Sequence, residues 1–150
     1  MLNQGDKAPD FVLDDDEGNE VSLEGLLAGG PLILYFYPAD FTPICTAEAC
    51  SIRDMHPRIL SANYQVVGIS PQSSQSHERF RKRHDLPFPL LYDRDRRVIN
   101  AFGVSGFLGM GVRRATFVID PDRTIRARVV SDLFVGSHVE FIEQAIAKSA

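Results

Sequence analysis

Apolar residues in this chain occur with two different spacings, which predict two kinds of element. Short apolar runs rich in Val, Ile, Phe and Tyr predict strands, and segments with apolar residues three or four apart predict helices. The predicted strands cover residues 32–37, 64–70, 88–92, 115–120 and 125–130, and the predicted helices cover residues 43 to about 63, about 74 to 84, 96–102 and 139–147. Because helices separate most of these strands, we expect a mostly parallel sheet covered on both faces.

Two hairpins modify this parallel arrangement. At the start of the chain, residues 11–13 and 21–23 flank an acidic, glycine-containing turn, and a short helix follows at residues 23–27. Near the end, Pro121 is well placed for a turn between two antiparallel strands. We therefore predict an α/β fold with a central mixed β-sheet, flanking helices and an N-terminal β-hairpin.

Two charged clusters along the chain raise the question of ligands. The four acidic residues at 14–17 are interpreted as a solvated turn rather than a cation site, because no other nearby residues complete an oxygen cage. The basic residues at 79–84 have helical spacing, and we interpret them as a solvated helix face.

Length and composition narrow the class of protein. The 150 residues predict a single domain, residues 1–150, and the net charge of −4 and pI near 5.5 argue against nucleic-acid and anionic-membrane partners. The polar start of the chain resembles no signal peptide, and no apolar run approaches the ~20 residues that cross a bilayer. We therefore expect a cytoplasmic protein, in which two cysteines indicate catalysis, sensing or metal binding before a structural disulfide.

The first cysteine, Cys45, lies where a helix is predicted to begin. Thr42 followed by Pro43 is a helix-start signal, because a hydroxyl can cap the helix and proline suits its first position. Cys45 then falls in the first turn, where unpaired backbone amides and the helix dipole favour an anion. A thiol placed there loses its proton more readily, and the thiolate is the reactive form.

The second cysteine, Cys50, is too far along the same helix for easy bonding. Five helical steps place the two cysteines ~140° apart with a rise of ~7.5 Å, so their Cα atoms are roughly 8–9 Å apart. A disulfide needs ~7 Å or less, so the pair can bond only if the first turns of the helix unwind. Pro57 cannot donate to the Arg53 carbonyl, and we expect it to kink or interrupt the helix and to ease this unwinding.

The apolar face of the helix predicts where the two thiols point. Ile52, Met55, Ile59 and Leu60 have the spacing of residues that face a sheet. Projected back, Cys45 falls on this inner side in a recess, and Cys50 turns toward its edge. A recessed thiolate needs hydrogen bonds to stay charged, and a nearby arginine would contribute most.

The pattern Pro38-x-x-x-Thr42-x-x-Cys45 resembles the active-site signature of peroxiredoxins. The position of the second cysteine, five residues further on, resembles that in the bacterioferritin comigratory protein subgroup, also called peroxiredoxin Q. The order of elements resembles a thioredoxin-like fold. The likeness extends over nearly the whole chain, through residues 5–11, 35–38, 67–70 and 114–120.

This resemblance implies a thiol-dependent peroxidase without a cofactor. Cys45 would be the peroxidatic cysteine, which attacks a hydroperoxide and becomes a sulfenic acid. Cys50 would be the resolving cysteine, which forms an intramolecular disulfide that thioredoxin or a similar dithiol protein reduces. The family also implies that Thr42 holds the peroxide oxygens and that Pro38 shields Cys45 from water.

The resemblance gives roles to a distant arginine and a glutamate as well. Arg114 would bind the peroxide and stabilise the thiolate, and Glu48 would orient Arg114. Glu48 alone would oppose the ionisation of Cys45, so this role requires a cation that pairs with it. Arg113 stands beside Arg114, and only one of two adjacent strand residues should enter the site; the family register selects Arg114.

The loop at residues 104–111 is unusually apolar, with Phe107, Leu108 and Met110. It is interpreted either as a wall of the substrate entrance that favours organic hydroperoxides, as a contact surface, or as a segment packed on the core. We expect a monomer, with a dimer through this loop as the alternative.

Two other functions remain open for the cysteine pair: a redox sensor switched by the disulfide, and a general thiol–disulfide oxidoreductase, which the missing Cys-x-x-Cys disfavours. A metal site is not expected, because the histidines have no ligand spacing with either cysteine except for Cys50 and His56, which a kinked helix does not bring together simply.

Overall fold

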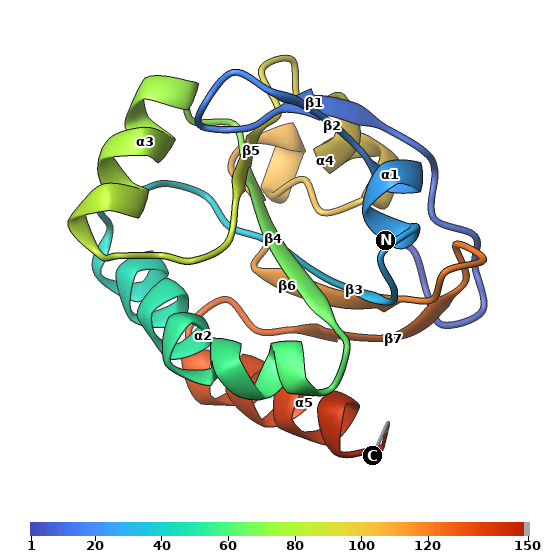
Figure 1. The fold of residues 1–150 in the computed structure, drawn as a ribbon. Helices are drawn as coiled ribbons and strands as arrows, with labels where there is room; N and C mark the ends of the chain where they lie inside the picture. The colour runs from blue at the N-terminus through green and yellow to red at the C-terminus, as the bar shows by residue number, and fades with distance from the viewer. Residues whose placement is uncertain (149–150) are drawn as a thin grey trace.

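The computed structural model describes residues 1–148, in which seven strands form one sheet with the order β2-β1-β5-β4-β3-β6-β7 (Figure 1). The strands are β1 (Val12–Asp14), β2 (Glu20–Ser22), β3 (Leu32–Phe36), β4 (Gln65–Ser70), β5 (Leu90–Tyr92), β6 (Ala115–Ile119) and β7 (Ile125–Val130). The helices are α1 (Leu23–Leu27), α2 (Pro43–Ser61), α3 (Ser74–Arg83), α4 (Arg97–Phe102) and α5 (Val135–Ala147), with a 3-10 turn at Phe107–Gly109.

The sheet is mixed, as predicted, and it begins with the predicted N-terminal hairpin. Only the pairs β3–β4 and β4–β5 are parallel, whereas β1–β2, β1–β5, β3–β6 and β6–β7 are antiparallel. The expectation of a mostly parallel sheet was therefore wrong. Its cause is the return of β6 beside β3 in the opposite direction, together with a hairpin at each end of the sheet.

Strand β3 lies in the middle of the sheet and is buried on both faces. Leu32, Leu34 and Phe36 belong to the core cluster that α1 and α4 cover. Ile33 and Tyr35 belong to the cluster beneath α2, α3 and α5, and Figure 1 shows α2 and α5 side by side on this face. The uninterrupted apolar run of β3 is thus explained, because a strand covered on both faces has no solvent side.

The start of α5 and the course of α2 at Pro57 differ from the prediction. Helix α5 begins at Val135 rather than at residue 139, because its first turn contains Gly136 and Ser137, which carry no apolar signal. Helix α2 continues through Pro57 to Ser61, close to its predicted end at about residue 63, so of the kink or interruption expected at Pro57 the interruption does not occur. The missing hydrogen bond of one proline is offset by Met55 and Ile59, which are buried against the sheet. Leu60 was predicted to face the sheet as well, but it is 53% exposed, so that prediction was wrong.

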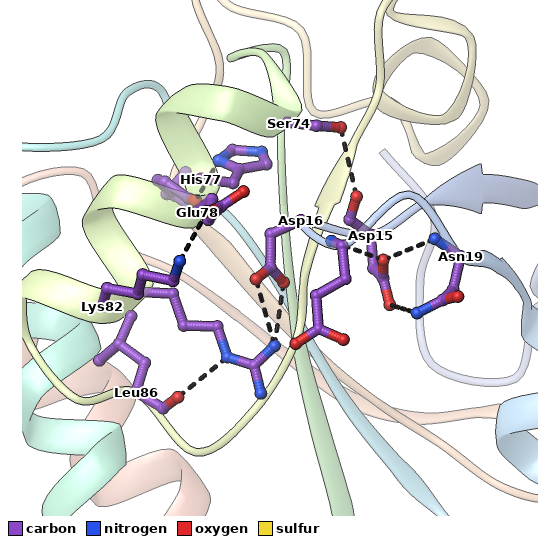
Figure 2. A network of polar contacts seen from close by, with 11 residues as sticks. Asp15, Asp16, Asn19, Ser74, His77, Glu78, Lys82 and Leu86 are labelled. Atoms are coloured by element: carbon purple, nitrogen blue, oxygen red, sulfur yellow. Dashed lines mark hydrogen bonds and ion pairs between the residues drawn. The ribbon is translucent and has the colours of Figure 1, made fainter.

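The acidic turn between β1 and β2 is folded inward at two of its four carboxylates. Asp15 accepts hydrogen bonds from the backbone amides of Glu17 at 2.8 Å and Asn19 at 2.9 Å, and Asp16 pairs with Arg81 at 3.0 Å. Figure 2 shows this turn facing helix α3. The interpretation as a solvated turn was therefore wrong for Asp15 and Asp16, because the basic helix α3 lies over them.

The basic cluster at 79–84 is mostly solvated, as predicted. Lys82 and Arg83 are exposed, and Lys82 pairs with Glu78 one turn earlier at 2.7 Å. Arg81 and His84 are the half-buried exceptions, because Arg81 ties α3 to the N-terminal hairpin and His84 packs against Phe41 and Phe80.

We expect Asp16→Asn to lower the free energy of unfolding by about 2 kcal/mol, because it leaves the partly buried Arg81 without its counter-charge. Urea unfolding measures this loss. The matched control is Glu143→Gln, which breaks the exposed pair between Arg58 and Glu143 and should cost less than about 0.5 kcal/mol. Equal losses in the two variants would contradict the structural role of Asp16.

Candidate active site

The chain leaves the sheet at the end of β3 and enters α2 through a short loop that carries the peroxiredoxin-like motif. Pro38 is half-buried in this loop, and Phe41 adopts a left-handed backbone with φ of 64° just before the helix. Pro43 is the first residue of α2, as predicted. Cys45 therefore lies in the first helical turn, and it is only 1% exposed.

Thr42 is the N-cap residue by backbone position, but its side chain does not cap the helix. Its hydroxyl donates to the carbonyl of Ala39 at 3.1 Å, so it bonds back into the loop. The prediction of a capping hydroxyl was wrong in this respect. The bond to Ala39 fixes the direction of the hydroxyl and leaves its oxygen able to accept a hydrogen bond from another molecule.

Arg114 immediately precedes β6, the strand next to β3, and brings a positive charge to Cys45. Ala115 pairs with Phe36, the last residue of β3, so Arg114 lies beside the start of α2. Its Nη1 donates to the Sγ of Cys45 at 3.0 Å, and its Nε donates to the carbonyl of Asp132 at 3.2 Å. This geometry brings a guanidinium within hydrogen-bonding distance of the sulfur.

Only one of the two adjacent arginines reaches the cysteine. Arg114 is 5% exposed, whereas Arg113 turns outward and pairs with the carboxylate of Asp132 at 2.9 Å. Burial acts to lower the pKa of Arg114, but the hydrogen bonds and charges of Cys45 and Glu48 outweigh it and raise the pKa. The guanidinium is therefore a permanent cation in the site.

Glu48 lies one turn after Cys45 and shares the same cation. Its Oε1 accepts a hydrogen bond from Nη1 of Arg114 at 3.3 Å, and its side chain is 1% exposed. Burial raises the pKa of Glu48 to about 7, although the charge and hydrogen bond of Arg114 act to lower it. The cation that the predicted role of Glu48 requires is thus present.

Cys50 follows on the same unbroken helix, and the two cysteines are free. Cys50 is half-buried, whereas Cys45 is buried. Because the helix is continuous between them, ideal geometry keeps their Cα atoms roughly 8–9 Å apart. A disulfide between them requires a local opening of α2.

Two buried histidines belong to the surroundings of the site, and sequence reasoning weighed them only as metal ligands. His138 of α5 lies with its Nδ1 3.6 Å from Oε2 of Glu48. His77 of α3 lies with its Nδ1 2.7 Å from Asp40, which also accepts a hydrogen bond from the hydroxyl of Tyr37 at 2.7 Å. No sequence pattern links these residues, because each pair joins separate elements through the tertiary fold.

Among residues 1–148, no three His, Cys, Asp or Glu side chains are grouped as metal ligands would be.

The loop at residues 104–111 exposes most of its large apolar side chains. Val104 is buried, but Phe107, Leu108 and Met110 are 86%, 81% and 74% exposed. The interpretation that this loop packs on the core was therefore wrong for these three side chains.

A mixed sheet with an arginine-bound cysteine at a helix start defines a thiol-dependent oxidoreductase. The chain belongs to the AhpC/TSA family, whose sequence profile matches residues 4–128. It is 41% identical over 124 residues to peroxiredoxin Bcp of Bacillus subtilis, a match that covers 79% of this chain and 78% of that protein. It is 42% identical over 126 residues to chloroplastic peroxiredoxin Q of Sedum lineare, a match that covers 83% of this chain and 67% of that protein.

Solved structures agree with this assignment. Peroxidoxin BcpB of Mycobacterium tuberculosis superimposes with a TM-score of 0.92 at 35% identity, over 99% of this chain and 98% of that structure. A cysteine-to-serine mutant of Xylella fastidiosa PrxQ gives a TM-score of 0.90 at 28% identity, over 100% of this chain and 99% of that structure. The fold is therefore thioredoxin-like, and the protein is a thiol-dependent peroxidase of the Bcp and peroxiredoxin Q type.

We predict that Arg114→Ala slows the reaction of the reduced protein with hydrogen peroxide roughly 100-fold, because it removes the only cation that contacts the sulfur in residues 1–148. Stopped-flow measurement of the second-order rate constant tests this. The control Arg113→Ala removes a neighbouring but exposed guanidinium and should change the rate less than about fivefold. A larger effect at Arg113 would mean that Arg114 is not the functional cation.

Proposed function

We propose that this peroxidase works through a two-cysteine cycle in which Cys45 reacts with the hydroperoxide and Cys50 resolves the product. The observation that carries the proposal is the 3.0 Å hydrogen bond from Arg114 to the buried Cys45 sulfur, on the helix that also holds the second cysteine of the chain. A buried sulfur with a cation beside it is suited to react as a thiolate.

In the first step, the Cys45 thiolate attacks the terminal oxygen of the hydroperoxide. The sulfur–oxygen bond forms, the oxygen–oxygen bond breaks, and water or an alcohol leaves after taking up a proton. Thr42 and Arg114 hold the peroxide oxygens, and Pro38 limits the access of water. Arg114 is positioned for this role because its Nε is anchored by the Asp132 carbonyl while its Nη1 donates to the sulfur.

In the second step, α2 opens locally and the Cys50 thiol condenses with the Cys45 sulfenic acid. The sulfur–sulfur bond forms and water leaves. A dithiol protein of the thioredoxin type then reduces the disulfide by thiol–disulfide exchange and returns both thiols. Glu48 orients Arg114 throughout, which its 3.3 Å contact with that guanidinium supports.

Organic hydroperoxides are proposed as substrates alongside hydrogen peroxide. The exposed apolar side chains at residues 107, 108 and 110 come from the loop whose residue Val104 accepts a hydrogen bond from the backbone amide of Arg113, next to the site. A relative of known structure, the bacterioferritin comigratory protein of Xanthomonas campestris, has alkyl peroxide reduction activity. An apolar rim favours a substrate with a hydrocarbon tail.

The cellular location is proposed from the two free thiols. No helix within residues 1–148 has the length and apolar character needed to cross a bilayer. We propose a cytoplasmic location, because reducing conditions keep both thiols free for catalysis. We also propose a monomer, with a dimer through the loop at residues 104–111 as the alternative.

A coupled assay with thioredoxin, thioredoxin reductase and NADPH separates a peroxidase cycle from a redox sensor. Wild-type protein should consume NADPH continuously while peroxide is present. Cys45→Ser should abolish this consumption, because the chain has no other thiol in the first turn of α2. A single stoichiometric oxidation of the wild type would instead support the sensor function.

Cys50→Ser tests the resolving step separately. This variant should react once with peroxide at the wild-type rate and then stop as a sulfenic acid, which a sulfenate-specific reagent traps. Full thioredoxin-coupled turnover in Cys50→Ser would rule out Cys50 as the resolving cysteine while leaving the role of Cys45 intact.

A further inference from the structure

Glu48 presents its second carboxyl oxygen to a buried histidine. Oε1 faces Arg114, but Oε2 lies 3.6 Å from Nδ1 of His138 and accepts no hydrogen bond from the residues that the structure describes. Glu48 and His138 are 1% and 0% exposed. A buried carboxylate oxygen without a donor is unfavourable, so the proton count of this pair matters.

The other contacts of His138 restrict where its hydrogens lie. Nε2 is 2.8 Å from the carbonyl of Ser131, so Nε2 must carry a hydrogen that it donates. Nδ1 is 2.8 Å from the hydroxyl of Thr116. In a neutral ring Nδ1 is therefore an acceptor, and without an additional proton it would face the acceptor Oε2 of Glu48 across 3.6 Å.

We propose that Glu48 and His138 share one buried proton, and that this proton prevents Glu48 from competing with Cys45 for the Arg114 guanidinium. His138 is then a positioning residue: it acts on the sulfur through Glu48 and Arg114, and does not touch the substrate. The inference rests on the proposed role of Cys45 as the attacking thiol.

The electrostatics of the pair agree with one shared proton. Burial raises the pKa of Glu48 to about 7 and lowers the pKa of His138, so neither residue holds its charge easily alone. Besides Glu48, the charged groups that face His138 are Arg114, which also lowers its pKa, and Asp132, which raises it; the hydrogen bond to the Ser131 carbonyl raises it as well. Tyr35 of β3 faces Glu48, but burial raises the pKa of Tyr35 well above its usual value, so it stays neutral. The proton sits on the carboxyl or on the ring, and the pair titrates as a unit.

Both positions of the shared proton have the same consequence for the cation. A neutral carboxyl beside a neutral ring, or a carboxylate beside an imidazolium, adds no net charge next to Arg114. Loss of the proton leaves the Glu48 carboxylate uncompensated, and it then competes with the Cys45 sulfur for the guanidinium, since Nη1 contacts both. The reactivity of Cys45 should therefore fall when the pair deprotonates.

The first test is the pH dependence of the rate constant for Cys45 with hydrogen peroxide. In the wild type we expect a decrease of roughly tenfold as the pH rises through about 7. Glu48→Gln cannot deprotonate and should lose this decrease. In His138→Gln the decrease should move to lower pH, because the pair without imidazole loses its proton more easily. His56→Gln removes another imidazole of lowered pKa, farther along α2, and should keep the wild-type profile.

Either of two results in this assay would overturn the proposal: a decrease that persists unchanged in Glu48→Gln, or an unchanged midpoint in His138→Gln. Thermal unfolding of each variant shows whether it is folded, and a merely structural role of His138 would lower stability without moving the midpoint.

A second measurement needs neither substitution of His138 nor peroxide. In reduced, isotope-labelled wild-type protein, NMR should show the His138 ring and the Glu48 carboxyl titrating with one common midpoint. Separate midpoints would contradict a shared proton. Because no peroxide is involved, this outcome is independent of whether Cys45 proves to be the peroxidatic cysteine.

Discussion

The site depends on one buried guanidinium that two acidic groups share. Nη1 of Arg114 contacts both the Cys45 sulfur and the Glu48 carboxyl, and the backbone and Nε of Arg114 are held by Asp132. The rest of the fold positions this cation. Strand β6 runs antiparallel to β3, so the start of β6 lies where β3 ends and α2 begins. One cation cannot fully compensate two buried anions. The protonation state of Glu48 therefore decides how strongly the Arg114 guanidinium interacts with the Cys45 sulfur.

Helix α2 must be intact for the proposed attack by Cys45 but must open for the proposed disulfide with Cys50. Its first turn positions Cys45 beside Arg114, and the same helix keeps Cys45 away from Cys50. The two parts of the helix are held differently, which indicates where it opens. Large apolar side chains, those of Ile52, Met55 and Ile59, are buried against the sheet beyond Cys50. The buried side chains of the first part, those of Cys45, Glu48 and Ala49, are small or polar. Opening of the first two turns therefore exposes less apolar surface than opening of the remainder.

The sequence was most informative where local chemistry and the family motif coincide. The helix start at Pro43, the burial of Cys45 and the choice of Arg114 over Arg113 follow from patterns within a few residues together with the peroxiredoxin resemblance. Of the kink or interruption expected at Pro57, the interruption does not occur, because packing against the sheet outweighs the loss of one helical hydrogen bond. His138 was beyond sequence reasoning, since only the packing of α5 against α2 brings it to Glu48.

The central claim is that one helix is folded for attack and opened for resolution. Hydrogen exchange of the reduced protein and of protein oxidised with one equivalent of hydrogen peroxide tests it most directly, with the disulfide checked by peptide mass. We predict a Cys45–Cys50 disulfide and faster exchange confined to residues 43–50, with residues 52–61 still protected. The account would be contradicted by unchanged protection of residues 43–50 in the disulfide form, or by complete oxidation without this disulfide.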